Sequence, residues 1–240
     1  MKVKKGHGQA RTLLEIYKAL LERFGWRDWW PGDTPFEVCI GAILTQNTAW
    51  TNVERAISGM KSAGLLDPEA ILSADIGDLA ESIRPAGYFN VKAARLRSFA
   101  GHLQNAHGGD LLSIAGKGPA GARADLLSIN GVGRETADSI LLYALEQPVF
   151  VVDAYTRRIF GRLGLVREDA AYDEVQSFFM TVLPRDIALY NDYHAQIVEL
   201  GKTHCKKTRP ICGGCPVAAW CGRDSEGGIA GRIPRRGNGE

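Results

Sequence analysis

The sequence predicts an all-α fold, and three observations support this. Apolar residues recur at helical spacing through most of the 240-residue chain. These runs begin and end at capping residues, Gly or Pro. Only one short segment, Val149 to Val152, has the β-branched and aromatic composition of a strand. The chain is therefore expected to consist of helices joined by turns.

The composition is that of an ordinary soluble globular protein, with 45% hydrophobic and 23% charged residues. The length suits one large or two small domains. A net charge of +2 indicates no particular partner, so any charge that binds nucleic acid must be local. The basic N-terminus lacks the apolar core of a signal peptide, and no run is apolar enough to span a membrane. A cytoplasmic location is expected, where disulfides are rare.

The first helix is expected at 10–24, where apolar residues share one face and Gly25 follows as a C-cap. Thr34 begins a capping-box pattern with Pro35 at the first helical position. The helix from Phe36 to Leu44 is apolar on nearly all sides and should be buried. Further helices are predicted at 51–63, 68–73, 76–84, 91–105 (capped by Asn90), 154–163, 172–182 and 186–203, with a Gly- and Ala-rich connector at 108–122 and a loose polar tail from Gly222.

Three tryptophans stand within five positions, at Trp26, Trp29 and Trp30, followed by Pro31. Trp is seldom fully buried, so such a group is unusual. It can act as a plug that packs one part of the fold on another. It can also form a stacking wall for a planar ligand.

The stretch from Leu126 to Asp153 is the centre of the functional interpretation. A helical run ends at Ile129-Asn130, the turn Gly131-Val132-Gly133 follows, and a second helix starts at Arg134. The glycines allow close approach of a ligand, and the next helix N-terminus favours an anion such as a DNA phosphate. A turn of this kind is also a common helix connection. Asp153 then follows an apolar segment, either as a functional carboxylate or as an N-cap.

Four cysteines lie within seventeen residues with the spacing C-x6-C-x2-C-x5-C: Cys205, Cys212, Cys215 and Cys221. Four thiolates so close together in a cytoplasmic protein indicate a metal centre. A four-cysteine zinc site usually has two C-x2-C pairs, whereas this chain has one, but zinc remains an alternative. Lys202 precedes Cys205, and three more basic residues lie between Cys205 and Cys212, namely Lys206, Lys207 and Arg209. These side chains form either a phosphate-binding patch or a solvated face.

The hairpin with Asp153, the phrase from Gly87 to Ala93 and the cysteine spacing together resemble the endonuclease III superfamily of helix-hairpin-helix DNA glycosylases. The resemblance implies two lobes with a cleft between them. One is a six-helix bundle at 34–149 that contains the hairpin motif at about 121–146. The other joins 1–33 to 150–240 and holds a [4Fe–4S] cluster on the four cysteines.

The resemblance also implies roles for single residues. Asp153 would be the catalytic carboxylate, facing the hairpin across the cleft. Gln46, at a helix end, would wedge into the space left by a flipped nucleotide; the alternative is simple helix termination. DNA contacts would come from the hairpin, the helix end and the basic loop: Gly131, Val132, Gly133, Arg134, Gln46, Lys206, Lys207 and Arg209. The base pocket would be formed by the aromatic group: Trp29, Trp30 and Pro31.

Members of this superfamily that also cleave the strand carry a lysine two residues after the second hairpin glycine. This chain has Glu135 there, which implies a monofunctional glycosylase without lyase activity. The run Gly41 to Thr48, the Trp29-Trp30-Pro31 phrase and Tyr193-His194 resemble the branch that removes 3-methyladenine. The expected partner is double-stranded DNA with a damaged base, bound by a monomer.

Three alternative functions follow from the same residues. The first is a glycosylase for uracil, mismatched thymine or hypoxanthine. The second is a bifunctional endonuclease III-like glycosylase and lyase. The third is a non-catalytic iron–sulfur DNA-binding protein, although simple phosphate binding requires neither Asp153 nor Gln46.

Overall fold

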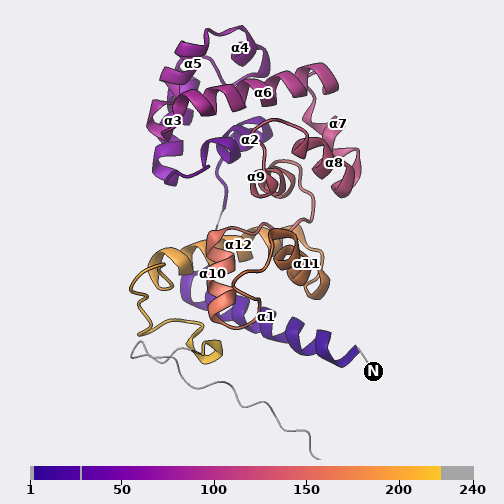
Figure 1. The fold of residues 1–240 in the computed structure, drawn as a ribbon, viewed down its shortest axis with the longest axis vertical. Helices are drawn as coiled ribbons and strands as arrows, with labels where there is room; N and C mark the ends of the chain where they lie inside the picture. Colours follow the sequence, from indigo (N-terminus) through magenta and orange to yellow (C-terminus); the bar gives the residue numbers. More distant parts are fainter. Residues whose placement is uncertain (1–2, 28, 223–240) are drawn as a thin grey trace, which may run out of the picture. The chain divides into compact units, whose positions relative to one another are not determined.

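The computed structural model describes residues 3–27 and 29–222 (Figure 1). Within these ranges the chain forms helices and irregular connections without any β-strand, so the all-α prediction is confirmed. The chain divides into two compact units, Trp30–Val151 and the combination of Met1–Trp29 with Val152–Glu240. No helix in the described ranges is both long and apolar enough to cross a membrane. The loose tail predicted from Gly222 lies, beyond that residue, outside the described residues.

The unit Trp30–Val151 contains eight α-helices within the described ranges (Figure 1). A 3₁₀ turn, Arg84–Ala86, precedes the longest of them, and a π-helical turn, Ile140–Ala144, continues the last. In chain order they are α2 (Pro35–Leu44), α3 (Trp50–Ser62), α4 (Pro68–Ser73), α5 (Ile76–Ser82), α6 (Phe89–His107), α7 (Leu111–Ala115), α8 (Gly118–Leu127) and α9 (Arg134–Ser139).

Helix α2 is the buried centre of this unit, as its all-round apolar sequence predicts. Every residue from Glu37 to Leu44 is buried. Thr34 caps the helix, accepting a hydrogen bond from the Glu37 N–H at 3.1 Å. The Glu37 carboxylate accepts from the N–H of Asp33 at 3.2 Å, one residue before the cap. The Thr34 hydrogen bond of the capping box therefore forms as the pattern predicts. The returning bond to Glu37 comes from Asp33, one residue before the N-cap.

Two expectations for this unit are wrong. Helix α6 starts at Phe89 with Tyr88 as its N-cap in a left-handed conformation, so Asn90 does not cap it. The segment expected as a connector at 108–122 contains α7 and the first half of α8. Asp110 caps α7 by accepting from the Leu112 N–H at 2.8 Å, and Pro119 is placed in the first turn of α8. These local stop and start signals divide one Gly-rich stretch into two short helices.

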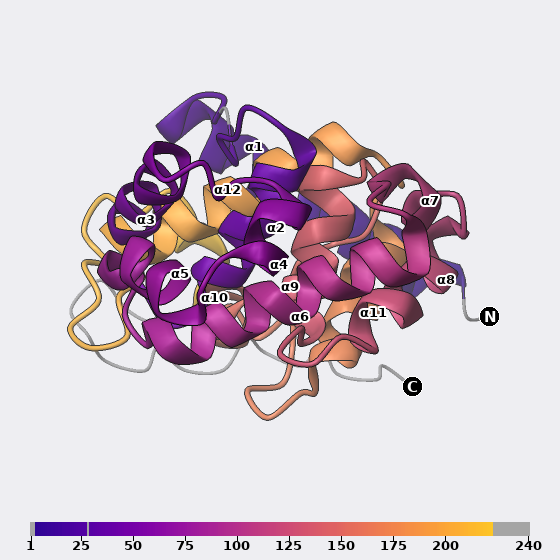
Figure 2. The ribbon, with the colours of Figure 1, turned by 90° about the horizontal axis from the view of Figure 1, so that it is seen from above.

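The second unit consists of α1 (Val3–Phe24), α10 (Ala154–Arg162), α11 (Tyr172–Val182) and α12 (Ile187–Thr203). Helix α12 packs on both α1 and α10, which joins the N-terminal segment to the C-terminal one (Figure 2). The fully buried Tyr193 donates from its hydroxyl to the Leu13 carbonyl at 2.8 Å. Its ring lies 6.1 Å from that of Phe179, itself 4.7 Å from Phe160. Burying side chains of this size contributes about 1.5–3 kcal/mol each.

Candidate active site

Asp153 is the N-cap of α10 and is only 8% exposed. Its Oδ1 accepts hydrogen bonds from the backbone N–H of Thr156 at 2.7 Å and from the Thr156 hydroxyl at 2.8 Å. The Asp153 N–H donates to the same hydroxyl at 3.4 Å, which completes a capping box. One carboxylate oxygen is thus fixed by the helix, and the other, Oδ2, has a different neighbour.

That neighbour is His194, a buried residue of α12 whose Nε2 lies 3.6 Å from Oδ2. Burial by itself raises the pKa of the Asp153 carboxyl. His194 and the two donors of Thr156 act in the opposite direction and outweigh burial, so the pKa lies below its ordinary value. Asp153 is therefore a carboxylate anion at neutral pH, at a helix N-terminus that favours negative charge. A buried anion of this kind can stabilise a developing positive charge and orient a water molecule.

The hairpin turn joins α8 to α9, and Gly131 is the residue that the turn itself requires. Gly131 has a φ of 89°, and a Cβ placed there would overlap the side chain of Arg95. The Val132 N–H donates to the Ile129 carbonyl at 3.1 Å, which closes the turn. Helix α8 ends at Leu127, two residues earlier than expected, whereas α9 begins at Arg134 as expected.

Gly133 is in a different situation from Gly131. Its backbone is extended, and a Cβ there would meet nothing within 4 Å. Gly133 and Arg134 are exposed, while the Val132 side chain is buried, so Val132 can offer a ligand only its backbone. The fold therefore needs glycine at the first position, and it leaves the second position open toward solvent.

Gln46 follows the end of α2, and its side chain is bound to the hairpin. Its Nε2 donates to the Gly131 carbonyl at 3.0 Å and to the Thr136 hydroxyl at 2.9 Å, and its Oε1 accepts from Arg95. Gln46 thus links α2 and α6 to both sides of the hairpin. A role as a wedge in DNA stays a prediction, and it would require these bonds to break.

Trp29 and Trp30, adjacent in the aromatic group at 29–31, belong to different units of the fold. Trp30 stacks on Tyr143 with ring centroids 4.7 Å apart and meets the ring of Trp50 at 5.2 Å. Trp29 belongs to the other unit, where the Lys202 ammonium lies 5.5 Å from its ring centroid. Pro31 is exposed. Each indole thus has an aromatic or cationic neighbour within its own unit, and a role of the group as the base pocket stays a prediction.

The four predicted metal ligands line one recess, together with apolar side chains: the recess contains Cys205, Cys212, Cys215, Cys221, Ile159, Leu163, Ile211 and Val217. Burial raises the pKa of the Cys215 thiol, and the three neighbouring cysteines raise it further. Among the described residues, no three of the cysteine sulfurs come within 4.8 Å of one another. The fold thus gathers the cysteines, at separations wider than one metal ion requires.

The basic loop inside the first cysteine gap is held through its backbone by two arginines of α10. Arg162 donates to the Lys206 and Lys207 carbonyls at 2.8 and 3.0 Å and to the Cys205 sulfur at 3.3 Å. Arg158 donates to the Cys205 carbonyl at 2.9 Å. The side chains of Lys206, Lys207 and Arg209 are exposed. The loop therefore presents three cations on a fixed backbone.

Glu135 lies exposed in the first turn of α9. No lysine occurs between Lys117 and Lys202, so the hairpin has no amine of its own. Lys92 of α6 is buried, and its ammonium donates to the Leu44 and Ala86 carbonyls at 2.7 and 2.8 Å. Both bonds hold this amine inside the fold.

Sequence reasoning gave no role to His194 or to Arg162, which act on predicted site residues. His194 stands on an otherwise apolar face of its helix, and an isolated histidine there was the available signal. Arg162 offered no signal, because its partners, two carbonyls and the Cys205 sulfur, lie more than forty positions away.

This fold, a hairpin followed by a buried carboxylate on an all-α frame, defines a helix-hairpin-helix protein. The family model "HhH-GPD superfamily base excision DNA repair protein" matches residues 40–185. The chain therefore belongs to this family, and it is a DNA glycosylase of base excision repair that binds DNA.

One relative and two solved structures are similar over most of the chain. A candidate DNA repair glycosylase of Methanocaldococcus jannaschii is 49% identical over 87% of this chain and 95% of its own length. A trapped endonuclease III–DNA covalent intermediate gives a TM-score of 0.76 at 23% identity, covering 88% and 95%, a likeness in fold. The 3-methyladenine DNA glycosylase of H. pylori, bound to 1,N6-ethenoadenine, gives 0.69 at 28% identity, covering 81% and 97%.

Proposed function

We propose that this protein is a monofunctional DNA glycosylase that releases alkylated purines, 3-methyladenine first, and leaves an intact abasic site. The observation that carries the proposal is the pair of Asp153 and Glu135. The first is a buried carboxylate anion, and the second occupies the position at which a lyase needs an amine.

Asp153 would act on the sugar. As the damaged base leaves, positive charge grows on the deoxyribose, and the Asp153 anion stabilises it and positions the attacking water. Two unit charges about 4 Å apart interact by about 4 kcal/mol at an effective dielectric constant of 20. That energy corresponds to about a thousandfold in rate. Thr156 and His194 hold the carboxylate ionised and in place for this step.

Lyase chemistry would need a lysine amine that attacks the sugar and forms a Schiff base. Glu135 cannot do so, and the bonded, buried amine of Lys92 is unsuited to it. Borohydride should therefore trap no covalent complex between the protein and lesion-containing DNA. Efficient trapping would show that another amine acts as nucleophile, and the monofunctional assignment would be dropped.

The alkylpurine assignment rests on leaving-group chemistry and on aromatic side chains. N-alkylated purines leave readily, some of them with a formal positive charge, so one carboxylate and little acid catalysis suffice. Trp30, stacked on Tyr143, and Trp29, next to the Lys202 ammonium, are surfaces on which an electron-poor base could stack. A cation–π contribution of about 0.5–2 kcal/mol would give at most about thirtyfold selectivity. Easier extrusion of the damaged base must supply the rest.

The cysteine recess fits a [4Fe–4S] cluster better than zinc. Zn–S bonds of about 2.3 Å in a tetrahedron bring ligand sulfurs within about 3.8 Å of one another. No three of the cysteine sulfurs described here lie within 4.8 Å of one another, and a cluster, in which each cysteine binds a different iron, accommodates such spacing. When bound, the cluster would cross-link the loop to α12. Purified protein should contain four iron and four sulfide per chain; one zinc and no visible absorbance would contradict this.

The test of function is release of free bases from methylated duplex DNA, measured against a no-enzyme control. Asp153→Asn is the matched variant, because Asn caps helices as well as Asp does. The variant should keep its DNA affinity and lose about a thousandfold in base release. Near-normal turnover would remove Asp153 from the mechanism. If uracil or thymine glycol is excised and methylpurines are not, the substrate assignment fails and the glycosylase remains.

A further inference from the structure

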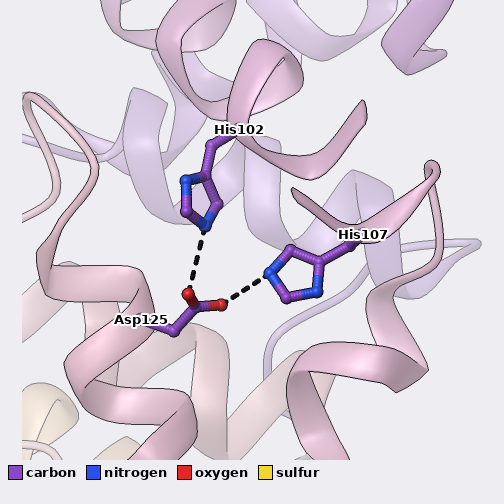
Figure 3. Close-up of side chains that lie close together, drawn as sticks. All are labelled: His102, His107 and Asp125. Carbon is purple, nitrogen blue, oxygen red and sulfur yellow. Dashed lines mark hydrogen bonds and ion pairs between the residues drawn. The ribbon is translucent and has the colours of Figure 1, made fainter. Parts of the chain in front are cut away.

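Three side chains of α6 and α8 converge at a place that neither the hairpin nor Asp153 uses (Figure 3). They are His102 and His107 of α6 and Asp125 of α8. Among the described residues, this is the only group of three or more His, Cys, Asp or Glu side chains whose ligand atoms all lie within 4.8 Å of one another. The His102 Nε2 lies 3.3 Å from Asp125 Oδ1, and the His107 Nε2 lies 2.7 Å from Oδ2.

The hydrogen bonds of His107 determine what its Nε2 can be. The Ser113 hydroxyl donates its one proton to the Asp110 carbonyl at 2.8 Å. Ser113 Oγ must then accept from His107 Nδ1, 2.6 Å away, so Nδ1 carries a hydrogen. In a neutral imidazole, Nε2 would then present a lone pair to a carboxylate oxygen. That nitrogen and the carboxylate oxygen, 2.7 Å apart, are then two acceptors that a bound cation would join.

The surroundings favour a bound cation. The side chain of His107 is 3% exposed and that of Asp125 is 14% exposed, while His102 is 22% exposed and gives access from solvent. The His102 Nε2 is buried, and the contact that it makes is the one with Asp125 Oδ1. Asp125 also faces the Lys117 ammonium at 3.1 Å. Lys117 is 43% exposed, so it can move into solvent and leave its place to another cation.

We propose that His102, His107 and Asp125 bind one zinc ion through both Nε2 atoms and the carboxylate, with a water as fourth ligand. Two imidazoles and a carboxylate favour zinc over magnesium or calcium, which prefer oxygen. Zinc bonds of about 2.0–2.1 Å put tetrahedral ligand atoms about 3.3 Å apart, which is the separation of His102 Nε2 from Asp125 Oδ1. The 2.7 Å contact of His107 Nε2 with Oδ2 is shorter and would have to lengthen when zinc binds. Ser113 orients His107 from the other ring nitrogen, as a metal-binding histidine requires.

Zinc here would fasten the C-terminal end of α6 to α8, the helix that leads into the hairpin turn. The ion would displace the Lys117 ammonium from Asp125. Affinity should therefore rise when Lys117 is removed and fall when a ligand is removed. A purely structural salt bridge would not respond to zinc at all.

The experiment is calorimetric titration of zinc into the purified protein with its cysteine centre loaded. We expect one zinc site per chain. Its affinity for zinc should fall about a hundredfold or more in His102→Gln, His107→Gln and Asp125→Asn, because each of these changes removes a direct ligand and not only a residue that hydrogen-bonds to one. Ser113→Ala should weaken it by about tenfold. Lys117→Ala should tighten it, whereas Lys18→Ala and Asp78→Asn, exposed controls on other helices, should leave it unchanged. Circular dichroism would verify that each variant is folded.

X-ray absorption at the zinc edge identifies the ligands. Nitrogen and oxygen neighbours at about 2.0 Å support this site, and sulfur neighbours at about 2.3 Å assign the zinc to the cysteines and overturn the proposal. The proposal is also overturned if the loaded protein binds no zinc, or if the ligand variants bind it as tightly as the unmodified protein. His102→Gln, at the more exposed ligand, keeps the test valid if His107→Gln does not fold.

Discussion

The two hairpin glycines should separate folding from DNA binding when each is changed to alanine. Gly131 has a positive φ, and its Cβ would overlap Arg95, which also bonds Gln46. A non-glycine residue in such a conformation costs about 1–3 kcal/mol. With about 2 kcal/mol lost, the melting temperature of a chain of this size falls by about 4–8 °C. Gly131→Ala should therefore be measurably less stable.

Gly133→Ala should have the opposite profile. Its backbone is extended and its Cβ would be in open space, so stability should change by no more than about 0.5 kcal/mol. If a DNA phosphate approaches the backbone here, a methyl group displaces it and weakens a charged hydrogen bond of about 1.5–3 kcal/mol. The DNA dissociation constant should then rise by about 10–150-fold.

The assay pairs thermal unfolding with fluorescence anisotropy on two undamaged duplexes of different sequence and one abasic duplex. Because a phosphate contact carries no sequence information, the loss in Gly133→Ala should be the same for all three. Unchanged DNA affinity in Gly133→Ala, or a loss confined to one sequence, would refute the phosphate contact. A Gly131→Ala protein as stable as the unmodified one would refute the steric argument.

Three further predictions concern other residues. His194 lowers the pKa of Asp153, so the carboxylate stabilises the fold above its ordinary pKa of 3.8, and this contribution is lost as pH falls through the lower folded value. In His194→Gln, acid unfolding and the acidic limb of the pH–rate profile should both move to higher pH. An unmoved limb would show that His194 does not control the ionisation of Asp153. Arg162→Gln should weaken DNA binding without changing base release at saturating DNA, because it frees the loop backbone; a fall in the saturated rate would contradict this. Lys92→Met should cost about 2 kcal/mol or more in calorimetric unfolding, since it leaves two buried carbonyls without a donor; an unchanged melting temperature would show that water replaces the ammonium.

The sequence by itself determined most helices, because helix formation depends on neighbours within four positions. The periodicity of 172–182 predicted α11 over its whole length, and Arg134 was predicted as the start of α9. Asp153 as an N-cap was likewise visible in the sequence. At Asn90 the error concerned which residue caps the helix, and in the 108–122 segment a connector was predicted where two short helices form.

The tertiary structure alone decided which distant residues meet. Gln46 is bonded to the hairpin across 85 positions, Trp30 is stacked on Tyr143, and the Lys202 ammonium lies near the ring of Trp29. The sequence placed two glycines in one turn, but only the positive φ of Gly131 and the packing of Arg95 against it distinguish the one that the fold requires. Such pairings depend on how helices pack and not on spacing along the chain. For that reason the carboxylate could be predicted from the sequence, and its histidine neighbour could not.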